Sequence, residues 1–124
     1  MRLATRNRQD VIGDIIAEYG LHDCAEIGVG TGPTTNAVLT RFPGIRWLAV
    51  DCWPNGYPLR DGGFISPESQ AERRARFMRV LAKHSGRVHL IEKDSVEAAA
   101  EVADGCLDLV FIDADHSYEG CKAD

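Results

Sequence analysis

Residues 24–33 read CAEIGVGTGP, an apolar run that passes through three alternating glycines into a proline. Cys24–Gly28 has the composition of a short buried strand. Pro33 lies where the first residue of a helix would be, ahead of the segment TTNAVLTRF, because proline is well tolerated in a first helical turn. The stretch therefore predicts a strand, a glycine loop and a helix, in that order.

Strands and helices alternate on both sides of this stretch. Apolar residues at helical spacing predict a helix over Asn7–Tyr19 that ends at Gly20. Three further strands are predicted over Ile45–Asp51, Arg87–Glu92 and Leu107–Asp113, and two further helices over residues 66–84 and 96–103. Because strands that alternate with helices form crossover units, we predict an α/β fold with a mainly parallel sheet covered on both faces.

The predicted helix over residues 66–84 has two different faces. Its apolar face is expected to consist of Ala71, Ala75, Met78 and Ala82. The other face carries four arginines, namely Arg73, Arg74, Arg76 and Arg79. We interpret these arginines as a solvated flank, supported by a Glu72–Arg76 pair one turn apart, in preference to a phosphate-binding face.

Composition limits the classes of function. The 124 residues, 44% of them apolar, are enough for one domain with a real core over residues 1–124. A net charge of -5 argues against nucleic acid or an anionic membrane as partner, so a small molecule is the expected ligand. The four cysteines form no CxxC pair and the N-terminus lacks a signal-peptide stretch, which predicts reduced thiols and a cytoplasmic location.

Every predicted strand delivers an acidic residue to its carboxyl end. Ligands of open α/β sheets bind outside the carboxyl ends of the strands, so these residues are candidates for one common site. In chain order they are Glu26 with the loop glycines Gly28, Gly30 and Gly32, then Asp51, then Asp94, and then Asp113 with Asp115 and His116.

The glycine loop has the spacing Glu-x-Gly-x-Gly-x-Gly. A dinucleotide fingerprint requires G-x-G-x-x-G, and its last position is occupied here by Pro33. Glycines let a ligand approach the backbone closely, although such a loop can also be only a tight turn. Asp51 favours the ligand interpretation, because a carboxylate at the end of the next strand can accept hydrogen bonds from both hydroxyls of a ribose.

At this point the sequence resembles the class I S-adenosylmethionine (SAM) dependent methyltransferases of the small-molecule O-methyltransferase type. AEIGVGTG is similar to their first motif, LAVD to their second, LIEKDS to the adenine-side motif, and DLVFIDADHSYEG to the motif that ends their fourth strand. The resemblance spans about Cys24 to the C-terminus. It implies a Rossmann-like three-layer sandwich and an enzyme that transfers a methyl group from SAM to an oxygen of a small molecule.

For the methionine part of the cofactor, the resemblance implies that Gly28, Gly30 and Gly32 line the binding site. Glu26 would hold this loop, or would bind the amino group through water. Both roles for Glu26 stay open at the level of the sequence.

For the adenosine part, the resemblance implies that Asp51 binds the ribose, that Cys52 and Trp53 flank the adenine, and that Asp94 with Ser95 meets its amino edge. Two of these residues have simpler alternatives. Trp53 can pack under the long loop that follows it, and Asp94 can cap the helix that follows the third strand, a position that Ser95 also suits.

At the end of the fourth strand, IDADHSYEG is similar to a segment of metal-dependent O-methyltransferases. The resemblance makes Asp113 a catalytic residue and a metal ligand, with Mg²⁺ as the suited ion, and His116 a base near the acceptor. Alternatively, Asp115 or His116 caps the next helix and Tyr118 packs on the sheet. The remaining metal ligands of this family usually come from a fifth strand, and none is predicted here.

Domains of this family have about seven strands in the order 3-2-1-4-5-7-6, and this chain supplies the first four. We therefore expect a domain truncated after its fourth strand, with the cofactor half present and most of the acceptor half missing. Either the sequence is a piece of a longer protein, or the open edge of the fourth strand is covered by a second copy or by a partner chain. The alternative functions are a non-catalytic SAM-binding or partner-completed module and, less favoured by the glycine spacing, a nicotinamide-dependent oxidoreductase.

Overall fold

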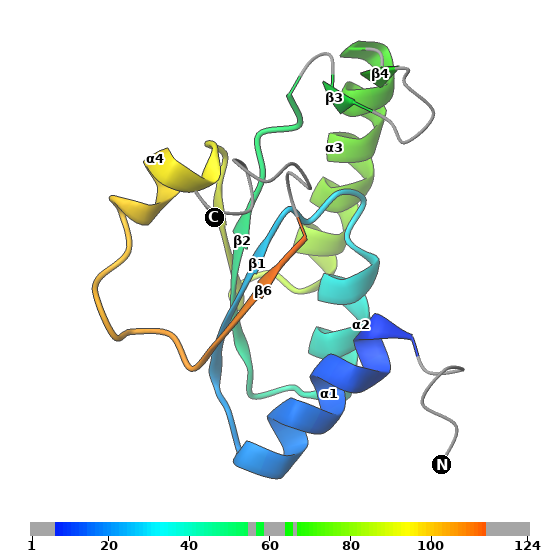
Figure 1. Ribbon diagram of the computed structural model, residues 1–124. Helices are drawn as coiled ribbons and strands as arrows, with labels where there is room; N and C mark the ends of the chain where they lie inside the picture. The colour runs from blue at the N-terminus through cyan, green and yellow to red at the C-terminus, as the bar shows by residue number, and fades with distance from the viewer. Residues whose placement is uncertain (1–6, 55–56, 59–63, 66, 114–124) are drawn as a thin grey trace.

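The computed structural model describes residues 7–54, 57–58, 64–65 and 67–113. The elements follow one another along the chain (Figure 1) as α1 (Arg8–Tyr19), β1 (Asp23–Ile27), α2 (Pro33–Arg41), β2 (Arg46–Val50), β3 (Tyr57–Pro58), β4 (Phe64–Ile65), α3 (Pro67–Lys83), β5 (Val88–Ile91), α4 (Ser95–Ala99) and β6 (Leu109–Ile112). The predicted alternation of strands and helices is confirmed. The antiparallel pair β3–β4 was missed, because it lies in the long loop that was expected after Trp53.

The main sheet has the strand order β5-β2-β1-β6, and all of its neighbouring strands are parallel. This is the order 3-2-1-4 among the predicted strands, so the α/β fold class is confirmed. The chain first builds outward from β1 to β2 and β5, and then returns to place β6 on the other side of β1. Such a reversal opens a crevice at the carboxyl ends of the central strands, where ligands of α/β proteins bind.

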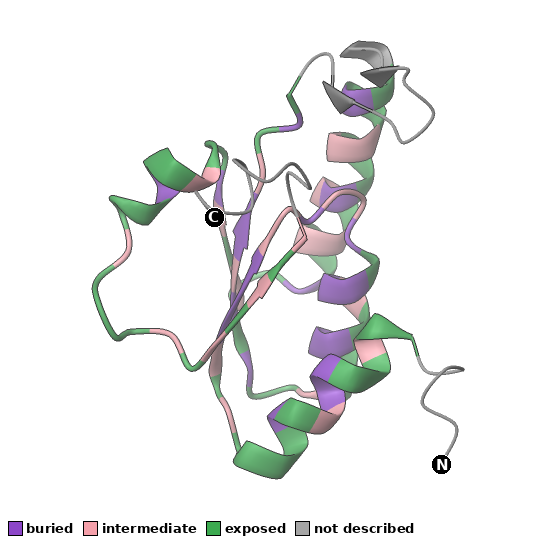
Figure 2. Cartoon of the chain, viewed as in Figure 1, coloured by how far each residue is buried: buried purple, intermediate pink, exposed green. Residues whose placement is uncertain are grey.

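The sheet lies between two helical layers of unequal size. Helices α1, α2 and α3 lie on one face and α4 lies on the other (Figure 1). The larger core fills the three-helix side, and its bulkiest members are Trp47 and Phe77. The α4 side has a smaller cluster around Val50 and Ile91, and Figure 2 shows the buried positions concentrated along the central strands and the inner sides of the helices. The expected three-layer sandwich is therefore present, and its layer on the α4 side consists of one short helix.

Local chemistry explains where the helices begin and end. The Asn7 side chain accepts a hydrogen bond from the backbone N–H of Asp10 (2.8 Å) and so caps α1, and Gly20 ends this helix in the left-handed conformation, as predicted. At α4 the cap is Asp94, whose side chain accepts from the N–H of Glu97 (2.8 Å). The assignment of the cap to Ser95 was wrong by one residue, because Ser95 is already the first residue of the helix.

The buried face of α3 differs from the predicted one. Ala71, Ala75 and Ala82 are exposed. The helix instead buries Gln70 and Phe77, and His84, seven residues further on, is buried just after the helix ends at Lys83. Met78 of the predicted face is partly buried and packs against the core. The prediction counted small apolar residues, whereas the structure buries the bulkier side chains, which remove more surface from water. This rotation also turns Arg73 partly inward, so the interpretation of the four arginines as a solvated flank was wrong for this residue, whereas the Arg74 side chain is 43% exposed.

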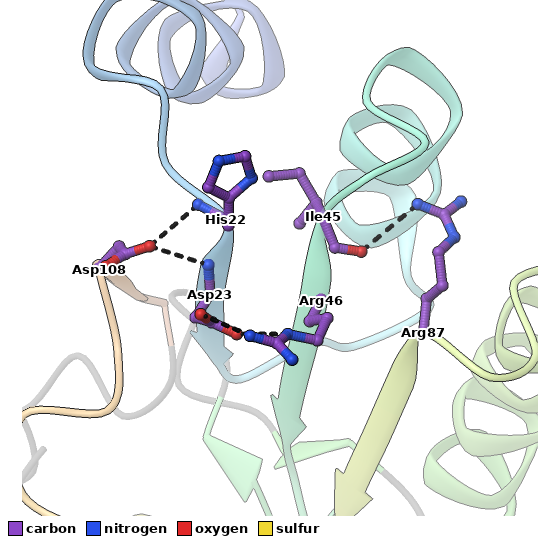
Figure 3. Close-up of polar contacts among 6 residues, drawn as sticks. All are labelled: His22, Asp23, Ile45, Arg46, Arg87 and Asp108. Atoms are coloured by element: carbon purple, nitrogen blue, oxygen red, sulfur yellow. Dashed lines mark hydrogen bonds and ion pairs between the residues drawn. The ribbon is translucent and has the colours of Figure 1, made fainter.

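Polar contacts join the strands at the amino ends of the sheet (Figure 3). The Asp108 carboxylate accepts hydrogen bonds from the backbone N–H groups of His22 (2.9 Å) and Asp23 (3.0 Å), which attaches the approach to β6 to the start of β1. Arg46 of β2 forms a two-bonded ion pair with the Asp23 carboxylate (2.7 and 3.0 Å). The end of the sheet away from the predicted site is thus fixed by charge-assisted hydrogen bonds.

Candidate active site

The glycine loop between β1 and α2 has a backbone that only glycine adopts readily. Gly28, Gly30 and Gly32 all have positive φ angles, of 89°, 59° and 90°. The N–H of Gly28 donates to the carbonyl oxygen of Val50 (2.8 Å), and the N–H of Gly32 donates to that of Val29 (3.0 Å), where α2 begins. The loop is therefore a rigid turn at the carboxyl ends of β1 and β2.

Gly32→Ala is expected to lower the free energy of unfolding by about 2 kcal/mol. An added Cβ would lie 3.0 Å from Cδ2 of Phe77 and 3.2 Å from Cγ2 of Val80, and alanine would be strained at a φ of +90°. Urea denaturation measures the change. Gly44→Ala is the matched control, since nothing lies within 4 Å of its added Cβ, and equal stabilities of the two variants would contradict the prediction.

Asp51 joins the glycine loop to the turn that follows β2. Its Oδ2 accepts a hydrogen bond from the N–H of Gly30 (3.0 Å), and its Oδ1 accepts one from the N–H of Trp53 (2.8 Å). A carboxylate has about four acceptor positions, so two backbone donors leave capacity for further donors such as hydroxyls. Asp51 is partly exposed, which keeps that remaining capacity accessible.

Trp53 is buried against the same loop. Its indole Nε1–H donates to the carbonyl oxygen of Gly30 (2.9 Å), and its ring lies 5.7 Å from that of Phe77 on α3, centroid to centroid. Its φ of 45° is the only positive value at a non-glycine residue of the described chain, a conformation that is strained for a side chain of this kind. The packing alternative for Trp53 is supported by these contacts, and its role beside an adenine stays a prediction.

Glu26 lies in the middle of the sheet and is almost fully buried. The Thr35 hydroxyl of α2 donates to its Oε1 (2.9 Å). Burial raises the pKa of Glu26 to about 8, with a smaller rise from the negative charges of Asp113 and Asp51, while the Thr35 hydrogen bond and the positive charge of Arg8 lower it. The Glu26–Thr35 bond ties β1 to the first turn of α2, which supports the loop-holding role.

Asp94, which follows β5, is the third acidic position and lies close to Asp51, the second. The N–H of Asp51 donates to the carbonyl oxygen of Ile91 (3.4 Å), so the ends of β2 and β5 lie side by side. Burial and then the negative charges of Asp51, Asp94 and Glu97 raise the pKa of the exposed Cys52 thiol. The carboxylate of Asp94 caps α4, which supports its capping alternative. Ser95, next to Asp94, is half-buried.

Asp113 follows β6, and its N–H donates to the carbonyl oxygen of Ile27 (2.7 Å), which places it beside the end of β1. Its carboxylate forms an ion pair with the guanidinium of Arg8, at the start of α1. Asp115, His116 and Tyr118 lie outside the described residues, so the predicted base cannot be compared with this position. Within the described ranges, no three His, Cys, Asp or Glu side chains gather as a metal site, and Asp113 is already paired with a cation.

The sequence interpretation missed Arg73 as a residue of this region. Its Nη2 atom would lie 3.0 Å from a Cβ added to Gly30, so its guanidinium occupies the space left free by that glycine. Its Nε atom is buried without a hydrogen-bond partner. The signal that could have located it is its place one turn before Phe77, the bulkiest apolar residue of α3.

The chain was compared with known proteins. A family model described as "Methyltransferase domain" matches residues 25–124. No curated protein matches. Solved structures do match, and among them is a Staphylococcus aureus protein assigned as a caffeoyl-CoA O-methyltransferase, with a TM-score of 0.66 and 18% identity over 95% of this chain and 50% of that one.

Two other solved structures carry ligands. The Podospora anserina methyltransferase PaMTH1, bound to S-adenosylhomocysteine (SAH), has a TM-score of 0.63 and 20% identity over 94% of this chain and 44% of that one. The cofactor-bound protein Rv0187 from MTB has a TM-score of 0.61 and 20% identity over 93% and 47%. The chain thus spans about half the length of these structures. At this identity the likeness shows a shared fold.

Proposed function

The chain belongs to the family of methyltransferase domains, and from this premise we propose that it binds SAM at the carboxyl ends of its strands and serves methyl transfer to an oxygen of a small molecule. The observation that carries the proposal is the Asp51 carboxylate, which bridges the glycine loop and the turn after β2 and keeps acceptor capacity free. PaMTH1, which shares the fold, is bound to SAH, and this supports a cofactor of the same kind for this chain.

The described residues fit such a cofactor in shape and in charge. The three glycines let the loop adopt positive φ angles that other residues resist, and Asp51 suits ribose hydroxyls. The acidic residues at the ends of four strands, Glu26, Asp51, Asp94 and Asp113, gather at one edge of the sheet. Burial raises the pKa of Glu26 to about 8, so it is mostly uncharged at neutral pH, and Asp113 is paired with Arg8. Asp51 and Asp94 are therefore the carboxylates that favour a ligand with a sulfonium and an ammonium charge.

When bound, SAM supplies the methyl group for an in-line displacement at its sulfonium. The task of the chain is then to align the acceptor and to remove its proton. We assign proton removal to His116 and acceptor positioning to Asp113, from their places in the segment IDADHSYEG. Arg8 would hold the Asp113 carboxylate in place through their ion pair.

Metal assistance is a separate part of the proposal. Among the described residues, Asp113 is the one oxygen ligand of the predicted metal position. Its carboxylate is paired with the Arg8 guanidinium, which competes with a divalent ion for the same oxygens. Measuring SAH affinity and methyl transfer with and without Mg²⁺ or Mn²⁺ tests this part. If neither quantity changes, the metal is removed from the proposal and the rest is kept.

The binding test is a calorimetric titration of the purified chain with SAH. We expect micromolar affinity, with NADH failing to compete, because the glycine spacing does not suit a dinucleotide. Competition by NADH at similar concentration would instead favour an oxidoreductase. A folded sample that binds neither ligand would overturn the proposed cofactor site.

The uncovered side of the sheet supports a partner or a second copy as part of the function. β6 is an edge of the described sheet, and its Val110 and Ile112 side chains are 45% and 46% exposed, unusually high for apolar residues of a strand. Sedimentation velocity of the purified chain is expected to show self-association. A single monomeric species at all concentrations would contradict it.

None of the helices in the described ranges is long and apolar enough to cross a membrane.

A further inference from the structure

Arg73 is a charged residue whose side chain has hydrogen-bond donors that the described residues do not fully use. Its neighbours on α3 have partners, since Arg74 pairs with Glu92 and Arg76 with Glu72. Among the described residues no ion pair involves Arg73, and its buried Nε has no hydrogen-bond partner. A buried polar atom without a partner costs free energy, so such an atom in a folded protein calls for a functional or structural reason.

The position of Arg73 connects it to the candidate site. Its guanidinium fills the space beside Gly30, the residue whose N–H contacts Asp51 and whose carbonyl oxygen contacts Trp53. It therefore stands at the glycine loop, which is the part of the site expected to hold the methionine end of the cofactor. The residue at position 30 lacks a side chain, and this absence is what lets the guanidinium approach.

The charges around this loop decide what Arg73 can bind. The neighbouring ionisable groups at the strand ends are acidic, and they suit the positive groups of SAM. The single anionic group of SAM and of SAH is the carboxylate of the amino-acid part, which needs a cation or several N–H donors. Two other arginines reach the strand ends among the described residues, and both are engaged, Arg8 with Asp113 and Arg74 with Glu92.

We propose that Arg73 binds the carboxylate of the amino-acid end of the cofactor at the glycine loop. A guanidinium suits this group because it can donate two parallel hydrogen bonds to a carboxylate, and among the described residues no ion pair already occupies the guanidinium of Arg73. The proposal rests on the proposed cofactor site and assigns one further residue to it.

The test compares two ligands that differ in the amino-acid part. SAH carries the carboxylate, whereas 5′-methylthioadenosine keeps the adenosine and the thioether and lacks it. Calorimetry measures both affinities for the wild-type chain and for Arg73→Gln. We expect Arg73→Gln to weaken SAH by roughly 10- to 100-fold, the loss typical of a charged hydrogen bond, and to leave 5′-methylthioadenosine unchanged.

Three further variants serve as controls. Arg73→Lys keeps the charge and is expected to recover part of the SAH affinity, although not the two-bonded geometry. Arg76→Gln makes the same charge change on the exposed side of α3 and is expected to bind both ligands as the wild type does. Arg8→Gln tests whether Arg8, rather than Arg73, binds the carboxylate of the cofactor. The ratio of the two affinities within each variant is insensitive to partial unfolding, which would weaken both ligands alike.

The outcomes separate this proposal from the proposed function. Unchanged SAH affinity in Arg73→Gln, an equal loss for both ligands, or a selective SAH loss in Arg8→Gln alone would each overturn the role of Arg73 and leave the cofactor site standing. If the folded wild-type chain binds neither SAH nor 5′-methylthioadenosine, the proposed function fails first, and the role of Arg73 fails with it.

Discussion

Asp51→Ala is expected to weaken SAH binding by about 100-fold or more. The variant removes the acceptor proposed for the ribose hydroxyls, and hydrogen bonds to a charged group contribute about 1.5–3 kcal/mol each. It also frees the N–H groups of Gly30 and Trp53, whose bonds to Asp51 hold the glycine loop against the turn after β2. Calorimetric titration with SAH measures the loss directly.

Two variants identify the cause of this loss. Asp51→Asn preserves the size of the side chain and one acceptor oxygen but presents N–H donors to the backbone donors of the loop, so it is expected to bind SAH weakly as well. Asp104→Ala, at an exposed position in the connection between α4 and β6, removes the same charge away from the site and is expected to bind normally. Wild-type affinity in a folded Asp51→Ala variant would refute the assignment of Asp51.

The free energy of unfolding is expected to fall by about 4 kcal/mol between pH 4.5 and pH 8 because of Glu26 alone. Burial raises the pKa of Glu26 from 4.5 to about 8 in the folded chain. Between these values the unfolded chain has released this proton and the folded chain still holds it, so the unfolded state binds fewer protons. The stabilisation from Glu26 is thus complete below about pH 4.5 and is lost as the pH rises to about 8.

Glu26→Gln is the variant that isolates this effect. Its amide resembles the protonated carboxyl in shape, and its Oε1 can still accept the hydrogen bond from Thr35. Urea denaturation of both chains at pH 5, 6.5 and 8 gives the comparison. The difference in stability is expected to grow in favour of the variant as pH rises, since other titrating groups are common to both chains. Parallel pH profiles would show that Glu26 titrates as it does in the unfolded chain.

The order of elements and the edge that carries the site were predictable from the sequence. Helical and strand periodicities involve residues only a few positions apart, and the strand, glycine loop and helix of Cys24–Pro33 are likewise read from neighbouring residues. The alternation could therefore be recognised without any long-range contact. Parallel strands share one carboxyl edge, and this geometry alone brings Glu26, Asp51 and Asp113 together. The strand order β5-β2-β1-β6 confirms the alternation and the parallel sheet, and the site at this edge stays a prediction.

The buried face of α3 and the role of its arginines were not predictable in this way. Ala75 and Phe77 both suit a helix, and which of them faces inward depends on the volume left by Trp53 and by Gly32 after the sheet has formed. Sequence spacing fixes the angle between two side chains around a helix and leaves its rotation toward the sheet open.

The sequence by itself determined the α/β alternation, the parallel sheet and the set of acidic strand ends, because these depend on local periodicity and on the shared direction of the strands. Only the tertiary structure decided which of these groups make contact. Asp51 reaches Gly30 across 21 positions, and Arg73 reaches the same glycine from α3. Contacts between residues so far apart in the chain depend on how the helices pack on the sheet, and that packing is set by the sizes and shapes of all the buried side chains together.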